Sequence, residues 1–188
     1  MGIIKNIVLK ENNINMKLDA LKKLKILLLA GGENKNKFTS EEIKFLQSSF
    51  KSSVTLYRGI SILINRITDI SKEKIKTLKI GDKIPIELLK LYNEYSSYTK
   101  KKSLAKRYSE GQFEFIFELT DYNKENILCD TEYLEKIIKN DIDIKNQTIF
   151  EREDFDYMKT DKEVIILENT LGNNLPTLIY KKFNTPIY

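Results

Sequence analysis

The sequence contains no histidine, and Cys129 is the single cysteine among its 188 residues. Without histidine the chain can form neither a Ser-His-Asp triad nor a histidine metal site. A single cysteine excludes an internal disulfide and any zinc site built from several cysteines. These absences exclude whole classes of catalytic and structural site before any motif is considered.

The chain also lacks a long hydrophobic run. The longest, residues 26–30, is far too short to span a bilayer. The first residues, 1–5, are not followed by a long apolar core and a small-residue cleavage site, as a signal peptide would be. We therefore expect a cytoplasmic protein with no membrane partner.

Arginine is scarce and the charge excess is small. Lys and Arg number 32 against 27 Asp and Glu, which gives a net charge of +5. This mild excess is not the strong field of a dedicated nucleic-acid binder, and no aromatic and basic platform for stacking bases is apparent. The heavy use of Lys, Ile and Asn indicates the coding bias of an AT-rich genome. The four arginines are Arg58, Arg66, Arg107 and Arg152.

Hydrophobic spacing predicts an α+β fold. Apolar residues at helical spacing predict a first helix over 16–30, stopped by the glycines at 31 and 32. Thr39 and Glu42 have capping-box spacing, so a second helix is expected over 40–50. Further helices are expected at 71–78, 85–92, 101–108 and 131–139, and strands at 54–59, 95–99, 112–119, 163–167 and 175–183. Residues 150–160 are polar, acidic and aromatic, and we expect a loop there.

No linker, repeat or low-complexity segment divides the chain. We therefore expect a single domain over residues 1–188. Its N-terminal helical part would cover about residues 1–52. Its core, which holds the candidate site, would cover about residues 53–188.

Two carboxylates stand at the start of the most hydrophobic strand. Glu163 opens the apolar run at 164–167, and Asp161 lies two residues earlier. If the strand begins at Asp161, both side chains point to the same face. Like charges this close are costly for structure alone, whereas a carboxylate here could stabilise positive charge at a sugar carbon. The alternative is a solvated pair that ends a loop.

Two other short motifs carry candidate polar groups. Arg58 and Gly59 follow a predicted strand, where the arginine fork could hold a phosphate and the glycine could let a ligand approach the backbone. Ser97 and Thr99 share one face of another predicted strand, where their hydroxyls could hold a neighbouring carboxylate. The alternative for the second motif is an edge strand that faces water.

In this order, the three motifs resemble those of the arginine–serine–glutamate class of mono-ADP-ribosyltransferases. The resemblance covers about residues 54–183. Leu56-Tyr57-Arg58-Gly59 is similar to the arginine motif, and Ser97-Tyr98-Thr99, with Ala105 and Tyr108 after it, is similar to the serine motif and its helix. Asp161-Lys162-Glu163 is similar to the catalytic acid motif. The implied fold is a split β-sandwich of two antiparallel sheets with flanking helices and an N-terminal helical segment.

The resemblance implies NAD as the co-substrate and no metal. Arg58 would hold the NAD pyrophosphate, and the Gly59 backbone would meet the nicotinamide amide. Ser97 would position the catalytic carboxylate, and Thr99 would support the site.

The resemblance also implies the catalytic roles. Glu163 would stabilise an oxocarbenium-like transition state as nicotinamide leaves, and Asp161 would act on the acceptor. Phe155 and Tyr157 would lie in the segment that recognises the target. The acceptor would be a protein, and modification of an arginine side chain is expected because the charge of Asp161 favours a guanidinium. The shorter reach of Asp161, where the family has Glu or Gln, leaves the acceptor type open.

Small size, the missing export signal and the compositional bias are more similar to intracellular, bacteriophage-encoded members than to secreted toxins. The acceptor would then be a protein of the host cell, modified in the host cytoplasm. Two alternatives stay open: an NAD glycohydrolase on the same fold, in which water takes the ribose, and a non-catalytic phage inhibitor that binds a host protein. A nucleic-acid acceptor is the weaker expectation.

Overall fold

The computed structural model describes residues 2–29, 37–51, 53–62, 74, 77–84, 95–111, 113–167 and 170–184. The helices in these ranges are α1 (Gly2–Leu29), α2 (Ser40–Leu46), α5 (Lys102–Ser109), α6 (Thr131–Asn140) and α7 (Arg152–Asp161), with short 3-10 turns η1 (Gln47–Ser49) and η3 (Lys124–Asn126). The strands are β1 (Leu56–Ile62), β2 (Tyr95–Thr99), β3 (Phe113–Leu119), β4 (Ile127–Asp130), β5 (Glu163–Leu167) and β6 (Thr177–Phe183). The fold is α+β.

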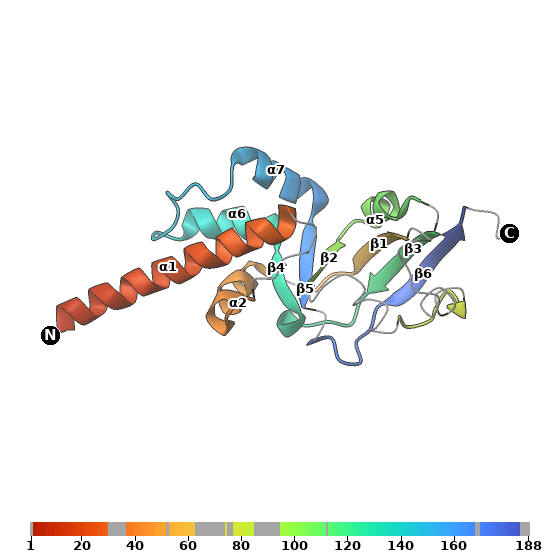
Figure 1. Cartoon of the computed structure of the whole chain (residues 1–188), viewed down its shortest axis with the longest axis horizontal. Helices are drawn as coiled ribbons and strands as arrows, with labels where there is room; N and C mark the ends of the chain where they lie inside the picture. The colour runs from red at the N-terminus through yellow and green to blue at the C-terminus, as the bar shows by residue number, and fades with distance from the viewer. Residues whose placement is uncertain are drawn as a thin grey trace.

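The strands form one open antiparallel sheet in the order β4-β5-β2-β1-β3-β6. β2 pairs with β5 along its full length, and β1 pairs with β3 along its full length. Between these two groups the described pairing is limited to Tyr57 opposite Thr99. The sheet therefore consists of two three-stranded halves, which diverge from this junction (Figure 1).

The helices are distributed unequally over the two halves. In Figure 1, α1, α2, α6 and α7 gather around β4 and β5, whereas α5 lies beside β1. The C-terminal part of α1 packs through Leu21, Leu24 and Leu27 into the same hydrophobic cluster as Tyr95 and Ile165. The N-terminal helical segment thus shares a core with the β4–β5–β2 half. None of the described helices is both long and apolar enough to cross a membrane.

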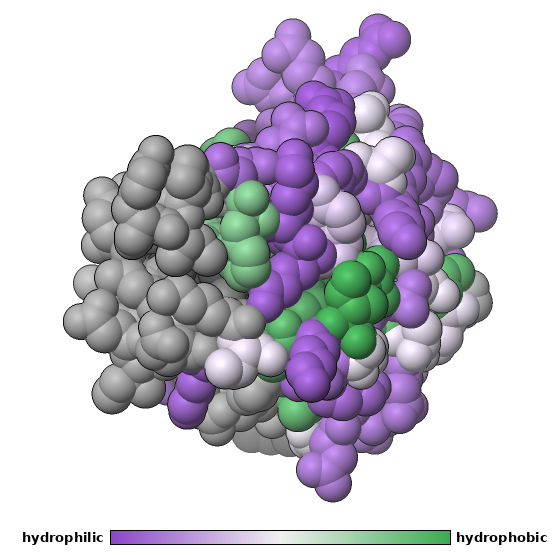
Figure 2. All heavy atoms as spheres, turned by 90° about the vertical axis from the view of Figure 1, so that its right-hand side faces the viewer, coloured by the Kyte–Doolittle hydropathy of each residue, from purple (hydrophilic) through white to green (hydrophobic). Residues whose placement is uncertain are grey.

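The β1–β3–β6 half has an aromatic core. Phe115 and Phe117 pack with Leu178 and Ile84 on one face of this half. Figure 2 views the end of the molecule on the right of Figure 1 and shows a small hydrophobic area surrounded by hydrophilic side chains. A further cluster, centred on Leu56, Tyr98, Leu119, Val164 and Ile166, joins the two halves on that face of the sheet.

Several local predictions are confirmed. The Thr39 hydroxyl accepts from the Glu42 amide at 3.3 Å, and the Glu42 carboxylate accepts from the Thr39 amide at 2.6 Å, which completes the capping box. The strand at Tyr95–Thr99 has the predicted bounds. The first helix is longer than predicted and begins at Gly2. The predicted helix at 85–92, most of that at 71–78 and the glycines at 31 and 32 lie outside the described residues.

The largest correction concerns the segment before β5. Residues 150–160, predicted as a loop, contain most of α7, which begins with a capping box between Glu151 and Asp154. The helix is mainly polar because only a narrow stripe, Phe155 and Met158, packs on the core. The strand begins at Glu163, so Asp161 is the last residue of α7 and does not share a strand with Glu163. Strand β4 was missed because four residues are too few to show alternation.

Candidate functional site

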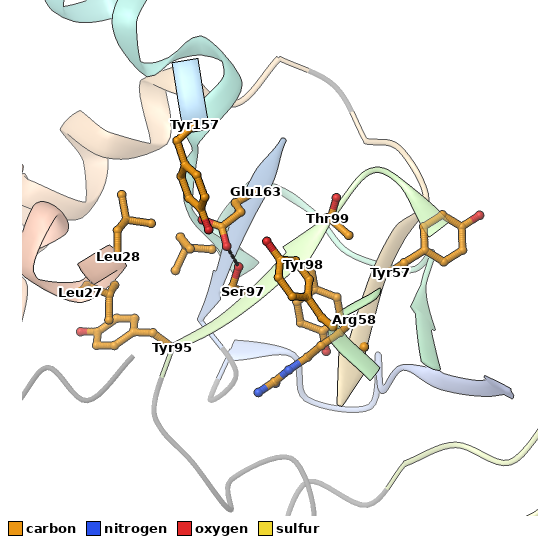
Figure 3. Close-up of a pocket in the computed structure, with 13 residues that line it drawn as sticks. Leu27, Leu28, Tyr57, Arg58, Tyr95, Ser97, Tyr98, Thr99, Tyr157 and Glu163 are labelled. Atoms are coloured by element: carbon orange, nitrogen blue, oxygen red, sulfur yellow. Dashed lines mark hydrogen bonds between the residues drawn. The ribbon is translucent and has the colours of Figure 1, made fainter. Parts of the chain in front are cut away.

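A cavity of about 350 Å³ lies between β1, β2 and β5 and the ends of α1, α5 and α7. Its polar lining includes Arg58, Ser97, Thr99 and Glu163. Five tyrosines contribute aromatic walls: Tyr57, Tyr95, Tyr98, Tyr108 and Tyr157. The volume is in the range of small-molecule sites, and a mostly apolar wall with few polar groups is typical of them. Figure 3 shows the labelled side chains around this space.

The centre of the cavity is a hydrogen bond between Ser97 and Glu163, called here the Ser97–Glu163 pair. Ser97 Oγ donates to Glu163 Oε1 at 2.6 Å (Figure 3). The register of β2 and β5 places Thr99 opposite Glu163 and Ser97 opposite Ile165, so Ser97 and Glu163 share one face. Burial raises the pKa of Glu163, and the nearby Asp161 charge adds to the rise, while the Ser97 hydrogen bond opposes it.

Asp161 is buried beside this pair, at 5% exposure. Its Oδ2 accepts from the Tyr108 hydroxyl at 2.8 Å, and its backbone carbonyl accepts from Thr99 Oγ1 at 2.7 Å. Burial raises the pKa of Tyr157, and hydrogen bonds with Tyr108 and Asp161 raise it further. The carboxylate therefore holds phenols of α5 and α7 together beside Glu163, while the Thr99 hydroxyl fastens the end of α7 to β2.

The residue between the two acids has an unusual backbone. Lys162 has φ 50° and ψ 47°, the left-handed conformation, and is the one non-glycine residue with positive φ in the described part of the chain. For a residue with a Cβ this conformation costs about 1 kcal/mol or more. It ends α7 and turns the chain into β5, so it sets the direction in which Glu163 enters the sheet.

Arg58 lies on the opposite face of β2 from the Ser97–Glu163 pair. Its Nη1 donates to Ser96 Oγ, and its guanidinium lies over the Tyr98 ring, 5.7 Å from the centroid. Because Tyr57 pairs with Thr99, strand alternation places Arg58, Ser96 and Tyr98 together on the other face. In Figure 3, the Arg58 guanidinium and Glu163 lie on opposite sides of the β2 ribbon.

Gly59 has a structural reason to be glycine. A Cβ at this position would lie 1.7 Å from the Ala105 carbonyl oxygen and 2.9 Å from the Ser109 amide nitrogen. Helix α5 therefore packs directly on β1 at the point where a side chain is missing. The glycine makes room for α5, whereas the sequence suggested that it makes room for a ligand; its backbone still lines the cavity.

The two residues predicted to recognise the target lie in different environments. Tyr157 is 57% exposed and lines the cavity. Phe155 is partly buried and packs against Phe150, with ring centroids 5.7 Å apart. Sequence reasoning did not assign Tyr57 or Tyr95 to the site, although Tyr57 lies within the arginine motif.

No family model, no curated protein and no solved structure matches this chain. Across the residues that the structure describes, no group of three or more His, Cys, Asp or Glu side chains could hold a metal ion. A function therefore has to be inferred from the residues of the cavity and their geometry.

Proposed function

We propose that the protein is an NAD-dependent mono-ADP-ribosyltransferase in which Glu163 is the catalytic carboxylate. The observation that carries the proposal is the Ser97–Glu163 pair, a carboxylate fixed at 2.6 Å by a neighbouring hydroxyl inside an aromatic cavity. A half-buried carboxylate with a raised pKa and a specific hydrogen-bond partner, in a cleft, is a typical functional group.

In the proposed reaction, the bond between the ribose anomeric carbon and the nicotinamide nitrogen breaks, and nicotinamide leaves with the electron pair. The ribose becomes an oxocarbenium-like cation until a nucleophile attacks the same carbon and loses a proton. The Glu163 carboxylate would stabilise this cation, which in a shielded site is worth about 3 kcal/mol or more. Ser97 would hold the carboxylate in place, so little reorganisation is needed.

The divided sheet supports the binding of an extended dinucleotide. Because β1 and β2 meet at one described register pair, the cavity can be reached by polar groups from both faces of β2. Arg58 would hold the pyrophosphate on one side while Glu163 meets the ribose on the other. The Gly59 backbone and Thr99 complete the proposed NAD site. The same division supports the expected split β-sandwich as the finer description of the fold.

A protein side chain is the proposed acceptor, with arginine as the first candidate, and exposed Tyr157 would contact it. If the gene belongs to a bacteriophage, the acceptor would be a host protein in the host cytoplasm. One observation favours a second candidate, an NAD glycohydrolase. The Asp161 carboxylate, expected to orient the acceptor, is buried and already accepts from Tyr108. Water needs no such acceptor site.

The primary test is Glu163→Gln, which keeps the shape but removes the charge. We expect nicotinamide release from NAD to fall at least about a hundredfold, with NAD affinity and fold largely unchanged. Release is measured with purified protein, and circular dichroism monitors the fold. Glu125→Gln, an exposed position on η3, is the matched control and should keep full activity. More than about a tenth of wild-type activity in Glu163→Gln, a loss under about 1.4 kcal/mol, would reject the catalytic assignment.

Asp161→Ala tests the role of Asp161, and the same assay on the wild type separates the two candidate reactions. Because Asp161 holds Tyr108 beside the Ser97–Glu163 pair, we expect nicotinamide release and protein modification to fall together, by about tenfold. Both are measured with labelled NAD and a cell lysate, followed by mass spectrometry of modified residues. Loss of modification with nicotinamide release intact would instead assign Asp161 to the acceptor. Nicotinamide release without any modified protein in the wild type would select the glycohydrolase.

A further inference from the structure

We propose that Glu132 and Lys162 are positioning residues for Glu163: an ion pair between them holds the left-handed turn from which Glu163 enters β5. The inference rests on the proposed function for its catalytic readout. Neither residue lines the cavity, and the sequence analysis assigned a role to neither of them, although Lys162 lies between the two acids of the catalytic acid motif. Their effect would act through the backbone next to Glu163.

The contacts connect the turn to α6. Lys162 Nζ donates to Glu132 Oε1 at 2.6 Å, and Glu132 lies in the first turn of α6. The second oxygen, Glu132 Oε2, accepts from Lys100 Nζ at 2.8 Å. Lys100 Nζ also reaches both Asp130 oxygens at 2.8 Å, and Asp130 is 2% exposed at the end of β4. These four residues, the charge network, join β2, β4, α6 and the turn.

Hydrogen bonds to the backbone connect this network to Glu163. The Lys100 amide donates to the Lys162 carbonyl at 3.3 Å. Thr131, the neighbour of Glu132, donates through Oγ1 to the Glu163 carbonyl at 3.0 Å. The backbone on both sides of the peptide between Lys162 and Glu163 is therefore held by groups that the charge network orders. A small rotation of this peptide would move the Glu163 carboxylate away from Ser97.

The identity of residue 162 supports this reading. At the end of a helix, a left-handed residue is usually glycine, which adopts that conformation without steric cost. A lysine there is strained, but it supplies an ammonium that reaches Glu132. Although burial opposes it, the hydrogen bonds from Lys100 and Lys162 lower the pKa of Glu132, as expected for a carboxylate held by two cations. The ion pair that the Lys162 side chain forms with Glu132 therefore offsets the backbone strain at Lys162.

The test compares two ways of removing the Lys162 ammonium. Lys162→Met keeps the strain and loses the bond, so kcat for nicotinamide release should fall about tenfold while KM for NAD changes less than about twofold. Lys162→Gly loses the bond together with the strain and should stay within about threefold of wild type. Glu132→Gln should match Lys162→Met, and adding Lys162→Gly to it should restore most of the loss. Glu135→Gln is the control, because it breaks the α6–α7 ion pair with Lys159 outside the network.

Equal losses in Lys162→Met and Lys162→Gly, or no recovery in the double variant, would overturn the proposal. If Glu132→Gln does not fold, the Met and Gly pair alone decides it. A second readout does not depend on activity: the titration of the Glu163 carboxyl, followed by carbon-13 NMR. Because the Ser97 hydrogen bond opposes the raised pKa of Glu163, that pKa should rise further in Lys162→Met and not in Lys162→Gly. If the wild type has no activity on NAD but the two variants show this titration difference, the proposed function is rejected and the positioning role is kept. If the wild type is active but the Glu163 carboxyl titrates identically in both variants, the positioning role is rejected and the proposed function is kept.

Discussion

The two halves of the sheet each carry a buried or partly buried carboxylate, and the surroundings shift the two pKa values in opposite directions. In the β1–β3–β6 half, Glu114 accepts from Lys106, from Asn184 at 2.5 Å and from Tyr180 at 3.1 Å. These donors, Lys106 first, lower the pKa of Glu114 to about 2. In the β4–β5–β2 half, Glu163 has Ser97 as its one donor among the described residues, and burial raises its pKa.

The difference distinguishes a carboxylate that stabilises the fold from a carboxylate that is available to a ligand. Glu114 has its oxygens saturated by a cation, an amide and a phenol, so it has little capacity left for a ligand. Glu163 is only half-buried and keeps acceptor positions open toward a cavity. A carboxylate that is desolvated without a cation is ready to interact with positive charge that develops later. The comparison therefore locates the chemistry in the β4–β5–β2 half, although both halves line the cavity.

The largest effect is expected where the two halves meet α5. Gly59→Ala would place a Cβ 1.7 Å from the Ala105 carbonyl oxygen, a backbone atom that cannot move without displacing α5. We expect a loss of about 3 kcal/mol or more in the free energy of unfolding, with a Tm lowered by about 10 °C. Urea and thermal unfolding measure both.

Gly172→Ala is the matched control for this substitution. Gly172 has φ +56°, but nothing lies within 4 Å of an added Cβ, so only the backbone strain of about 1 kcal/mol is expected. If Gly59→Ala were no more destabilising than Gly172→Ala, this result would contradict the direct packing of α5 on β1 at Gly59.

Two adjacent serines test the two faces of β2. Ser97→Ala removes the donor to Glu163 and should lower kcat for nicotinamide release about tenfold, or about 1.4 kcal/mol, with KM little changed. Ser96→Ala removes the partner of Arg58 and should instead raise KM for NAD several-fold with kcat little changed. Arg58→Lys, which keeps the charge without the fork, should raise KM more than Ser96→Ala does. The same kinetic change in both serine variants would contradict the division of roles between the faces.

Local sequence signals predicted the elements that are determined by residues close together in the sequence. The capping box at Thr39, the β2 strand and the β3 strand each depend on neighbouring residues, and the structure confirms them. Glu114 alternates with phenylalanines along β3, a pattern in which the polar residues usually face water. It is 5% exposed because α5 and β6 supply Lys106 and Tyr180 over that face. A partner supplied from a distant part of the chain cannot be seen in the strand itself.

The candidate site was predictable in its members more than in its arrangement. The spacing of Ser97 and Thr99 placed two hydroxyls on one face, and one of them does reach Glu163. Asp161 does not share a strand with Glu163 because a left-handed lysine ends α7 between the two acids, a conformation that sequence normally marks with glycine. The side of β2 on which Arg58 lies depends on the register of Tyr57 with Thr99, and register between distant strands leaves no local signal.

The smallest expected effect is a pair of opposite pH dependences in stability. The lowered pKa of Glu114 means that its carboxylate stabilises the fold above the ordinary value of 4.5 and that this contribution is lost as the pH falls toward about 2. The raised pKa of Glu163 has the opposite sign, because the folded state favours the protonated acid and loses stability as the pH rises through that pKa. Glu114→Gln should therefore be less stable than wild type at about pH 7, with the difference shrinking in acid.

Glu163→Gln should be at least as stable as wild type at about pH 7, and any advantage should shrink as the pH falls through the pKa of Glu163 and disappear below the ordinary carboxyl value of 4.5. The Gln side chain can still accept from Ser97, so the change removes a half-buried charge without removing the hydrogen bond. Urea unfolding of both variants and wild type at several pH values measures the two differences. If Glu163→Gln were destabilised at neutral pH as Glu114→Gln is, Glu163 would be a satisfied structural carboxylate, and the contrast between the two halves would fail. A stable but inactive Glu163→Gln would instead show that this position is selected for chemistry at the expense of stability.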